Sequence, residues 1–266
     1  MITKALQIIE SYANIKPKAA IILGSGLGPF ADTLEKKIKI PTTEIPGYPK
    51  STVEGHQGFL VFGYYNNIPL LAIQGRTHYY EGYSIDQVTF IINILNDLNI
   101  KLLLVTNAAG TVNERFQPGD LMLITDQINF MFANPLIGKQ YISKKRSAYY
   151  TESYFEQIEE IAMDNQIALK RGVLCASTGP TYETSAEIKM LRRFGGDAAS
   201  MSTVPEVIAA NNYGFDVIGI SCITNYATGI GKHKLSHKEV TETATKVQEK
   251  FTDLVREIIS KIFAKF

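Results

Sequence analysis

The stretch STGPTYETSAEIKMLRRFGGDAASMSTVPEVIAA, residues 177–210, predicts two helix starts separated by one short buried strand. The tetrapeptides TSAE (184–187) and TVPE (203–206) have the spacing of capping boxes, in which a hydroxyl and a carboxylate bond the free amides of a helix's first turn. Gly195 and Gly214 are placed to end the two helices, and the apolar run DAASMS lies between them. The segment is therefore predicted as helix, strand and helix in immediate succession.

Two corners of this stretch face outward toward a potential ligand. Tyr182 and Glu183 come just before the first helix, and Met201 and Ser202 lie at the end of the strand. One interpretation aims the Glu183 carboxylate at a polar ligand, while Ser202 and the amides after it receive an anion. In the alternative interpretation, Glu183 only neutralises the positive end of a helix. The stretch by itself leaves both open.

The length, composition and net charge limit the classes to which the protein can belong. A chain of 266 residues with 45% hydrophobic residues can bury a large core, as one α/β domain or two smaller ones. A net charge of +1 with interleaved signs gives no basic face, so nucleic acid is not an expected partner. No run has the ~18 apolar residues of a membrane span, and the charged N-terminus has no signal-peptide core. Cys175 and Cys222 lie in apolar runs, as buried thiols of a reducing compartment do. A cytoplasmic protein without membrane association is expected.

A glycine turn follows the first predicted strand. The apolar run AAIIL continues into GSGLG (24–28), and Pro29 stands in the first turn of the next helix. Strand, glycine turn and helix form a phosphate-binding geometry, because bare backbone amides can approach an anion. The glycine spacing fits neither a dinucleotide-binding fingerprint nor a Walker loop. A tight turn without a ligand remains the alternative.

A cluster of polar residues ends the predicted hairpin that turns at Asn66–Asn67. In QGRTHYYEGY, Arg76 and His78 are two residues apart, so on an extended backbone they project to the same side. Such a pair can grip a phosphate, the arginine by its fork and the histidine by one donor. His56, between glycines at the start of the hairpin, is either a further ligand or a solvated loop residue.

The remaining predicted strands also end in polar or small residues. KLLLVTNAAG predicts a buried strand ending at residues 107–110, and FDVIGISCITN predicts one ending at Asn225. Further helices are expected at residues 3–14, from a capping box at 84–87, and from a capping box at 236–239 to the C-terminus. Because ligands bind at the carboxyl ends of strands in open α/β sheets, five such ends indicate one site. No linker or repeat divides the chain, so a single domain over residues 1–266 is predicted.

Taken together, GSGLG, GHQG, QGRTHYYEGY, TNAAG, GPTYETSAE, MSTVPE and TNYATGI…SHKEV resemble, in this order, the trimeric-class purine nucleoside phosphorylases. The match extends from Ile21 to Val240. The resemblance implies a single α/β domain with a distorted mixed β-sheet flanked by helices. It implies phosphorolysis of inosine, guanosine and their deoxy forms to free base and (deoxy)ribose 1-phosphate, in purine salvage. It also implies a homotrimer that uses inorganic phosphate as co-substrate and no cofactor.

The resemblance also assigns residues. The phosphate site implied is Ser25, His56, Arg76, Thr77, His78, the Ala108 amide and Ser202; the ribose is lined by Tyr80, Met201 and His237; the purine is held by Tyr182, Glu183 and Asn225; and the catalytic groups are Asn225, Glu183 and His78. Tyr182 stands where the family more often has phenylalanine, which should still stack on the base. The departure from the family lies at residues 138–160, where a phenylalanine usually reaches the neighbouring subunit; Tyr141 is the nearest candidate.

The chemistry explains these residue types. Breaking an N-glycosidic bond leaves positive charge on the sugar, which a fixed phosphate stabilises, and negative charge on the purine. Donation from the Asn225 amide to the purine's ring nitrogen and exocyclic oxygen stabilises the second charge. Glu183 accepts the ring N–H of a 6-oxopurine, whereas adenine presents a lone pair there. The four histidines show no ligand spacing, so no metal is expected.

Three rival functions are weighed against this one. A methylthioadenosine phosphorylase of the same superfamily would carry aspartate at the position of Asn225 and lack Glu183. A non-catalytic nucleoside-binding protein would not need both the arginine–histidine grip and the leaving-group amide. A dinucleotide oxidoreductase is disfavoured by the glycine spacing.

Overall fold

The apolar runs that predict strands form one mixed sheet. The computed structural model describes residues 2–53, 57–140, 148–231 and 237–265 of the chain. The strands of this described part are β1 (Ala19–Leu23), β2 (Glu35–Pro41), β3 (Phe59–Tyr65), β4 (Ile68–Gln74), β5 (Leu102–Thr111), β6 (Leu121–Asn129), β7 (Leu169–Ala176), β8 (Ala198–Ser200) and β9 (Asp216–Tyr226). Every residue of β1 is buried, as its uninterrupted apolar sequence predicts for a strand covered on both faces.

The sheet partly closes on itself. Its strand order is β2-β3-β4-β1-β5-β8-β7-β6-β9, and β9 pairs with β5 as well as with β6. This additional pairing joins β5, β8, β7, β6 and β9 into a ring, so the mixed sheet is distorted as the sequence motifs imply. The resulting α/β fold is a single domain built on one sheet.

One edge of the sheet collects the strand ends that the sequence singles out. β4, β1, β5 and β9 are successive parallel neighbours, so their carboxyl ends point the same way. The short strand β8 runs antiparallel to β5, where it pairs with Gly110 and Thr111 at the end of that strand. The chain that follows β8 therefore runs back along β5 to this same edge.

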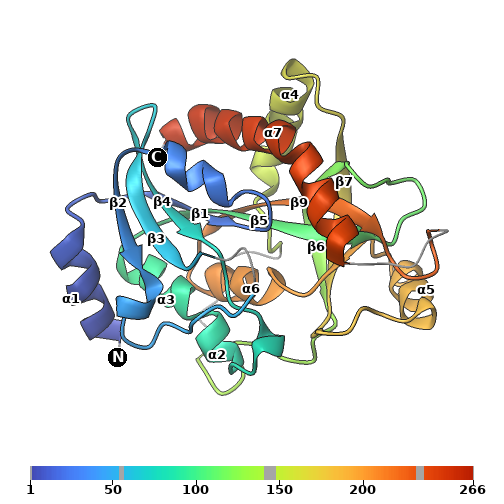
Figure 1. Cartoon of the computed structure of the whole chain (residues 1–266), viewed down its shortest axis with the longest axis horizontal. Helices are drawn as coiled ribbons and strands as arrows, with labels where there is room; N and C mark the ends of the chain where they lie inside the picture. The colour runs from blue at the N-terminus through green and yellow to red at the C-terminus, as the bar shows by residue number, and fades with distance from the viewer. Residues whose placement is uncertain (1, 54–56, 141–147, 232–236, 266) are drawn as a thin grey trace.

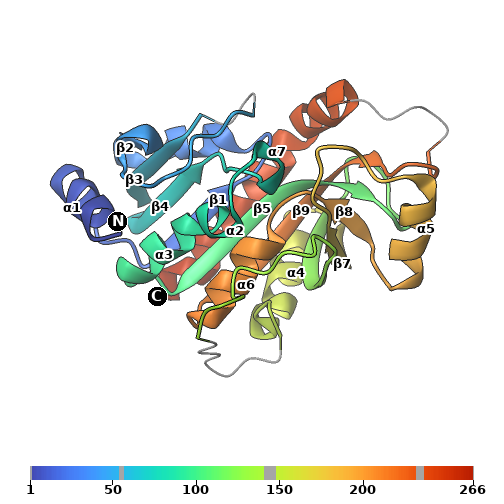
Figure 2. The ribbon, with the colours of Figure 1, turned by 90° about the horizontal axis from the view of Figure 1, so that it is seen from below.

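Helices cover both faces of the sheet. The α-helices of the described residues are α1 (Ile2–Tyr12), α2 (Ile85–Val88), α3 (Phe90–Asp97), α4 (Phe155–Asp164), α5 (Ser185–Arg193), α6 (Val204–Asn212) and α7 (His237–Ile262). Short 3-10 turns are η1 (Gly28–Thr33), η2 (Thr42–Glu44), η3 (Tyr79–Glu81), η4 (Glu152–Tyr154) and η5 (Phe263–Lys265). α7 crosses one face, and α3 and α6 lie side by side on the other (Figures 1 and 2). All nine residues of α6 are buried, so this helix lies inside the molecule.

The long last helix uses its apolar stripe for the core. Phe251, Leu254, Ile258 and Ile262 are all at most 2% exposed, and Val247 packs at the margin of the same cluster. The stripe recurs at helical spacing, so one face of α7 buries against β9. The predicted cap of this helix at Ser236 lies outside the described residues.

Local signals account for several element boundaries. The Ser84 and Gln87 side chains form the predicted capping box at the start of α2. The hairpin between β3 and β4 turns at Asn66 and Asn67, both with positive φ, as a tight two-residue turn requires. Gly195 and Gly214 have positive φ just after α5 and α6, so they end these helices as expected.

Three elements differ from the sequence-based expectation. β2 was not expected. Its sequence EKKIKIP places Lys36, Lys37 and Lys39 at the exposed edge of the sheet, and these lysines interrupt the apolar pattern that would predict a strand. The segment after GSGLG is a 3-10 helix instead of an α-helix. The single helix expected after the capping box at residues 84–87 is divided into α2 and α3 at Thr89, whose hydroxyl donates to the Ile85 carbonyl.

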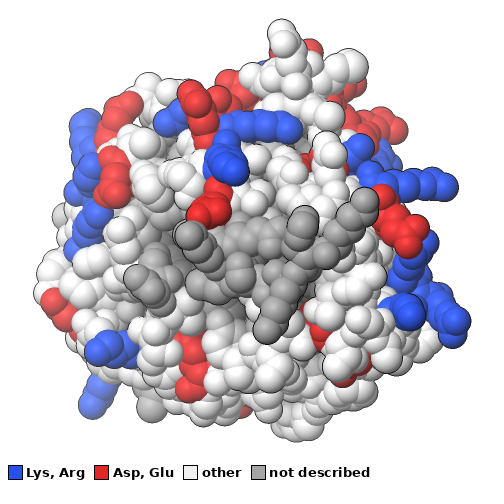
Figure 3. Space-filling model, turned by 45° about the vertical axis from the view of Figure 1, so that its right-hand side comes forward, with Lys and Arg blue, Asp and Glu red and all other residues white. Residues whose placement is uncertain are grey.

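The surface and the cysteines agree with the composition. Basic and acidic side chains both occur around the rim of the face shown in Figure 3, and neither sign covers that face. Cys175 and Cys222 are both free and buried, and burial raises the pKa of each thiol to about 12, so neither is a reactive thiolate. None of the helices in the described part of the chain is long and apolar enough to cross a bilayer.

Candidate active site

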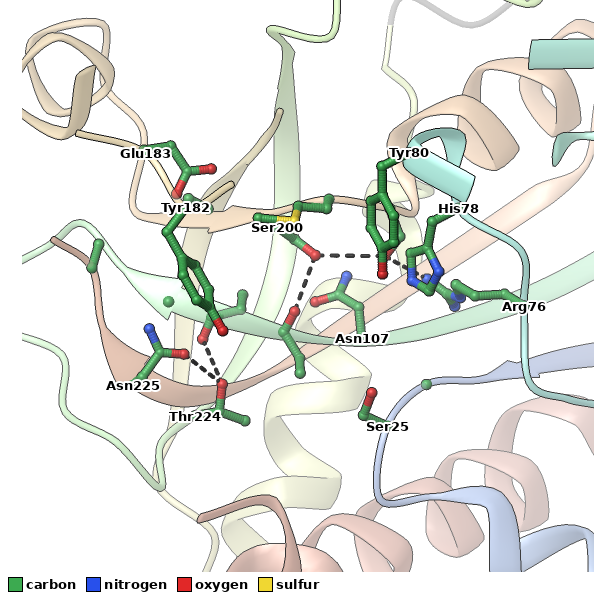
Figure 4. Close-up of a pocket in the computed structure, with 18 residues that line it drawn as sticks. Ser25, Arg76, His78, Tyr80, Asn107, Tyr182, Glu183, Ser200, Thr224 and Asn225 are labelled. Atoms are coloured by element: carbon green, nitrogen blue, oxygen red, sulfur yellow. Dashed lines mark hydrogen bonds between the residues drawn. The ribbon is translucent and has the colours of Figure 1, made fainter. Parts of the chain in front are cut away.

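A pocket opens where the strand ends meet. It holds about 800 Å³ of space, with the open solvent at its mouth included. It is lined by Gly24, Ser25, Arg76, His78, Tyr80, Asn107, Ala108, Ala109, Gly110, Tyr182, Glu183, Ala199, Ser200, Met201, Ser202, Thr224, Asn225 and Ala227. Arg76, His78 and Tyr80 lie at one end in Figure 4, and Tyr182, Glu183 and Asn225 lie at the other. We call these the arginine end and the glutamate end.

The turn after β1 brings backbone to the floor of the arginine end. A Cβ on Gly24 would lie 2.6 Å from the Thr106 carbonyl oxygen, so only glycine allows this approach to β5. The Thr106 hydroxyl accepts a hydrogen bond from the Gly24 amide and donates one to the Ile22 carbonyl. Ser25 is thereby fixed beside the end of β5, where it faces the pocket (Figure 4).

Arg76 is the buried charge of this end. Its Nη1 donates to the hydroxyls of Ser202 and Thr203 at 2.9 and 2.8 Å, and its Nη2 donates to the Thr106 carbonyl at 2.7 Å. Burial lowers the pKa of Arg76, while the nearby Glu206 carboxylate raises it. Glu206 Oε1 lies 3.9 Å from Arg76 Nε in an almost fully buried pair. The protein therefore fixes a desolvated guanidinium at the pocket, supported by an opposite charge behind it.

Thr203 has a different role from the one that its sequence predicts. It precedes α6 with φ of 77°, and its side chain makes no capping hydrogen bond. Its hydroxyl instead accepts from Arg76 and from the Asn107 amide, and Glu206 faces Arg76. The predicted capping box at residues 203–206 is therefore wrong, because long-range partners take both of its side chains.

His78 is oriented by a carboxylate. Glu81 Oε1 accepts from the His78 amide at 2.6 Å and contacts its Nδ1 at 3.1 Å, while Glu81 Oε2 accepts from the Thr52 amide and hydroxyl. Burial alone would raise the pKa of Glu81, but these hydrogen bonds lower it to about 2. A carboxylate that stays ionised can only accept, so it favours the proton on Nδ1 and leaves Nε2 for a ligand.

Tyr80 stacks on this histidine. The two rings lie 4.8 Å apart between centroids with an interplanar angle of 14°. Burial raises the pKa of Tyr80 to about 12, so its hydroxyl stays protonated near neutral pH and can donate a hydrogen bond. Its hydroxyl end points into the middle of the pocket (Figure 4).

At the glutamate end, a bulge in β9 shapes the pocket wall. The pairing of β9 with β5 shifts between Ala109 and Gly110, whose partners are Ile223 and Asn225, so Thr224 is the extra residue. Successive residues of a regular strand face opposite sides, yet Thr224 and Asn225 both line the pocket. The Thr224 hydroxyl donates to Asn225 Oδ1 at 2.8 Å, and Asn225 Nδ2 donates to the Tyr226 carbonyl at 3.1 Å. The Asn225 amide is therefore held in one orientation with its Nδ2 as the donor.

Gly110 makes room for this amide. A Cβ at Gly110 would lie 2.7 Å from Asn225 Nδ2. Any side chain there would displace the amide, so the glycine of TNAAG is needed to accommodate Asn225 on the neighbouring strand.

Glu183 does not cap the helix that it precedes. The Thr184 and Glu187 side chains form the predicted capping box of α5, which satisfies that helix terminus. Glu183 Oε1 instead accepts a 2.5 Å hydrogen bond from the Ser177 hydroxyl, and Glu183 lines the pocket. Glu183 therefore lies in the wall of the pocket and takes no part in the capping box of α5.

The comparisons with known proteins agree with this site. The sequence model of the phosphorylase superfamily matches residues 18–260. Purine nucleoside phosphorylase 1 of Geobacillus stearothermophilus is 49% identical over 263 residues, covering 97% of this chain and 96% of that protein. The Bacillus subtilis (strain 168) protein of the same name is 47% identical over 265 residues, covering 98% of both. The chain belongs to the purine nucleoside phosphorylase family.

A solved structure supports the same conclusion. Schistosoma mansoni purine nucleoside phosphorylase in complex with inosine matches this phosphorylase with a TM-score of 0.90 and 34% identity, covering 98% of this chain and 96% of that one. The family and fold class inferred from the motifs are thereby confirmed.

The structure brings most of the predicted site residues of this phosphorylase into one pocket. These are Ser25, Arg76, His78, Tyr80, Ala108, Tyr182, Glu183, Met201, Ser202 and Asn225. Thr77 lines a separate, smaller cavity that Arg76 also lines. His56 and Tyr141 lie outside the described residues, as does the side chain of His237.

Three polar residues of the pocket carry no site assignment from the sequence. Asn107 is buried and binds Thr203, Ser200 donates to the Ala108 carbonyl, and Thr224 holds Asn225. Each is adjacent to a residue that the motifs do assign. Polar residues inside otherwise apolar strand ends were the signal that could have identified them.

No group of three or more potential metal-binding side chains occurs among the residues that the structure describes. The chemistry of the pocket is instead that of an arginine, a histidine, a carboxylate and an amide.

Proposed function

We propose that this phosphorylase cleaves 6-oxopurine nucleosides, inosine and guanosine with their deoxy forms, with inorganic phosphate as co-substrate. The products are the free purine and (deoxy)ribose 1-phosphate, as purine salvage requires. The observation that carries the proposal is one pocket with a buried arginine at one end and a carboxylate–amide pair at the other. No further cofactor is needed for this reaction.

The arginine end fits a phosphate. Arg76 provides a fixed positive charge, and His78, Ser25, Ser202 and the Ala108 amide supply hydrogen-bonding groups around it. A phosphate dianion held here lies beside the sugar and stabilises the positive charge that develops as the glycosidic bond breaks. The same phosphate is the nucleophile that receives the sugar.

The glutamate end fits a purine leaving group. Asn225 Nδ2 has two N–H groups, of which one is donated to the Tyr226 carbonyl, leaving the other for the purine. Donation to two purine atoms at once would require that contact to break. Negative charge builds on the purine as the bond lengthens, so this donor binds the transition state more strongly than the substrate.

Glu183 selects the base. A 6-oxopurine presents a ring N–H to the carboxylate, whereas adenine presents a lone pair at the same place. Facing a lone pair would leave the Glu183 charge without a partner in the pocket, which disfavours adenosine. Tyr182, 41% exposed, lies over this end and provides a ring on which the base stacks.

The test is incubation with inosine, guanosine and adenosine, each with and without phosphate, followed by measurement of free base. Phosphate-dependent release from inosine and guanosine is expected. Release from inosine at the same rate without phosphate would identify a hydrolase, and preference for an adenine nucleoside would favour a methylthioadenosine phosphorylase. Binding without any release would favour a non-catalytic nucleoside-binding protein.

We further propose that the chain forms a homotrimer in the cytoplasm. Phe132 and Ile137 are 84% and 77% exposed, and the Phe130 ring packs against Phe132 at 4.8 Å between centroids. Exposed apolar side chains of this kind favour a protein partner, and a second copy of the chain is the occupant that we propose.

Sedimentation tests the assembly. Phe132→Ser should shift the protein from trimer toward monomer, whereas Met163→Ser, which removes a side chain that is 71% exposed on α4, should leave the trimer intact. A fully active monomer of the unmodified chain would contradict the proposal.

A further inference from the structure

The contact that orients Glu183 comes from a residue outside the pocket. Ser177 follows β7 directly and does not line the pocket, yet its hydroxyl donates to Glu183 Oε1 at 2.5 Å. The two residues are six apart, on the loop between β7 and α5. No sequence motif singles out Ser177 as a ligand.

The main chain of Ser177 is fixed to the neighbouring strand. Its amide donates to the Ser200 carbonyl at 2.9 Å, at the end of β8. The Ser200 hydroxyl in turn donates to the Ala108 carbonyl at 3.0 Å. The hydroxyl that meets Glu183 therefore projects from backbone that the sheet holds in place, although Glu183 itself lies on a loop.

A carboxylate on three rotatable bonds needs such a partner to keep one orientation. Ordering a glutamate side chain costs free energy that must otherwise be supplied when the ligand binds. The Ser177 hydroxyl has a single proton, which it gives to Oε1 and so leaves Oε2 to accept from a ligand. Capping of α5 does not compete for Glu183, because Thr184 and Glu187 already do this.

We propose that Ser177 is a positioning residue for base selection, which rests on the proposed function of Glu183. It holds the carboxylate so that Oε2 meets the ring N–H of a 6-oxopurine. Without the hydroxyl, the carboxylate turns away from the base, and the penalty against the lone pair of adenine falls with it. Ser177 thereby sets both the affinity for 6-oxopurines and the discrimination against 6-aminopurines.

The experiment compares Ser177→Ala with Ser177→Thr, which keeps a hydroxyl, and with Thr181→Ala, an exposed hydroxyl on the same loop. In Ser177→Ala we expect the KM for inosine to rise about tenfold, the size of one hydrogen bond to a charged group, with kcat within about threefold. The KM for phosphate should stay within about twofold, because the arginine end is unchanged. Ser177→Thr should recover most of the loss, and Thr181→Ala should match the unmodified protein.

A double-mutant cycle separates positioning from folding. In a Glu183→Ala background, Ser177→Ala should have less than about a twofold further effect on the KM for inosine, because its partner is gone. Additive losses in the cycle, or equal losses in the KM values for phosphate and inosine, would overturn the inference and indicate a structural role. An unchanged KM for inosine in Ser177→Ala would also overturn it.

Failure of the inference is distinguishable from failure of the proposed function. Unmodified protein that releases no base from inosine and phosphate would contradict the function itself. Calorimetric titration with hypoxanthine needs no turnover, and a dissociation constant that rises about tenfold in Ser177→Ala would still support the inference. An unchanged constant would overturn it.

Discussion

The two ends of the pocket are built in different ways. At the arginine end, Arg76, Ser202, Thr203 and Asn107 are each less than 9% exposed and bond to one another. At the glutamate end, Asn225 is fixed on β9, whereas Tyr182 and Glu183 come from a loop, where the Ser177 hydroxyl orients the carboxylate.

The difference indicates that the phosphate site is rigid, whereas the choice of base is adjustable. A buried network keeps its geometry before the ligand arrives, so its contribution to binding is already organised. A loop carrying one carboxylate can change its specificity with few substitutions, because few contacts fix it. We therefore expect phosphate use to be harder to alter than the choice of base.

The largest effect is expected at the arginine end, from Arg76→Ala. Loss of the guanidinium removes the charge that meets phosphate and leaves Glu206 buried without it, so kcat/KM for phosphate should fall about 10²–10³-fold. Initial rates over a range of phosphate concentrations measure this. Arg76→Lys, which keeps the charge but not the fork, should recover part of the loss.

Thermal unfolding of both variants is the control, since the network also holds the strand ends together. A folded Arg76→Ala protein with an unchanged requirement for phosphate would contradict the proposed anion site.

The next effect is expected at the glutamate end, from Asn225→Asp. The change removes a donor to the leaving purine, and such losses cost about 10²-fold in rate. It also supplies an acceptor for the exocyclic amine of adenine, so the ratio of kcat/KM for inosine to that for adenosine should fall. Glu183→Gln should also weaken use of 6-oxopurines, but mainly through KM, because its contact is present in the ground state.

Measurement of kcat/KM for both nucleosides on each variant decides the matter. A ratio of inosine to adenosine that does not move in Asn225→Asp would show that this amide does not recognise the base.

A smaller effect tests how much the arginine end depends on the Glu81 carboxylate that orients His78. The pKa of Glu81 is lowered to about 2 in the folded protein, below the ordinary value of 4.5. Its stabilisation is therefore present above pH ~4.5 and is lost as the pH falls toward ~2. Urea unfolding between pH 3 and 7 should show Glu81→Gln less stable than the unmodified protein at neutral pH, with a difference that shrinks in acid. The KM for phosphate should also rise, by up to about tenfold, because the neutral glutamine oxygen accepts more weakly from His78 than the carboxylate does.

A stability difference that stays constant down to pH 3 would show that these hydrogen bonds do not lower the pKa of Glu81.

The smallest effect is expected for Tyr182→Phe. The hydroxyl is removed, but the ring that stacks on the base remains, so kcat/KM for inosine should stay within about threefold. Tyr182→Ala, which removes the ring as well, should lose more, and steady-state rates on inosine compare the two. A large loss in Tyr182→Phe would show that the hydroxyl takes part in recognising the base.

The sequence could predict interactions between residues that are close together in the chain, but not those between residues that are far apart in it. The capping box of Thr184 and Glu187 is complete within four residues, and it was predicted correctly. The same pattern at Thr203 failed because its hydroxyl bonds Arg76, which is 127 residues away in the chain. A local pattern cannot reveal a competing partner that the fold supplies.

The same reasoning applies to the fold and the site. β1 is an uninterrupted apolar run and was recognised, whereas the lysines of β2 belong to an edge that only the sheet order defines. Arg76 and Asn225 were found because polar residues at strand ends are conspicuous. The roles of Thr224 and Ser177 depend on the register of β9 and on contacts across the loop, which no spacing encodes.

The extra residue in β9 has a consequence for protein engineering. Deletion of Thr224 would restore regular alternation along the strand and leave Asn225 opposite Gly110, but it would remove the hydroxyl that holds the Asn225 amide. A designer who grafts this base-recognition amide onto another scaffold must therefore transfer an irregularity in strand length together with the asparagine. Libraries that vary side chains at fixed length would never sample that change, so they explore only part of what this strand can do.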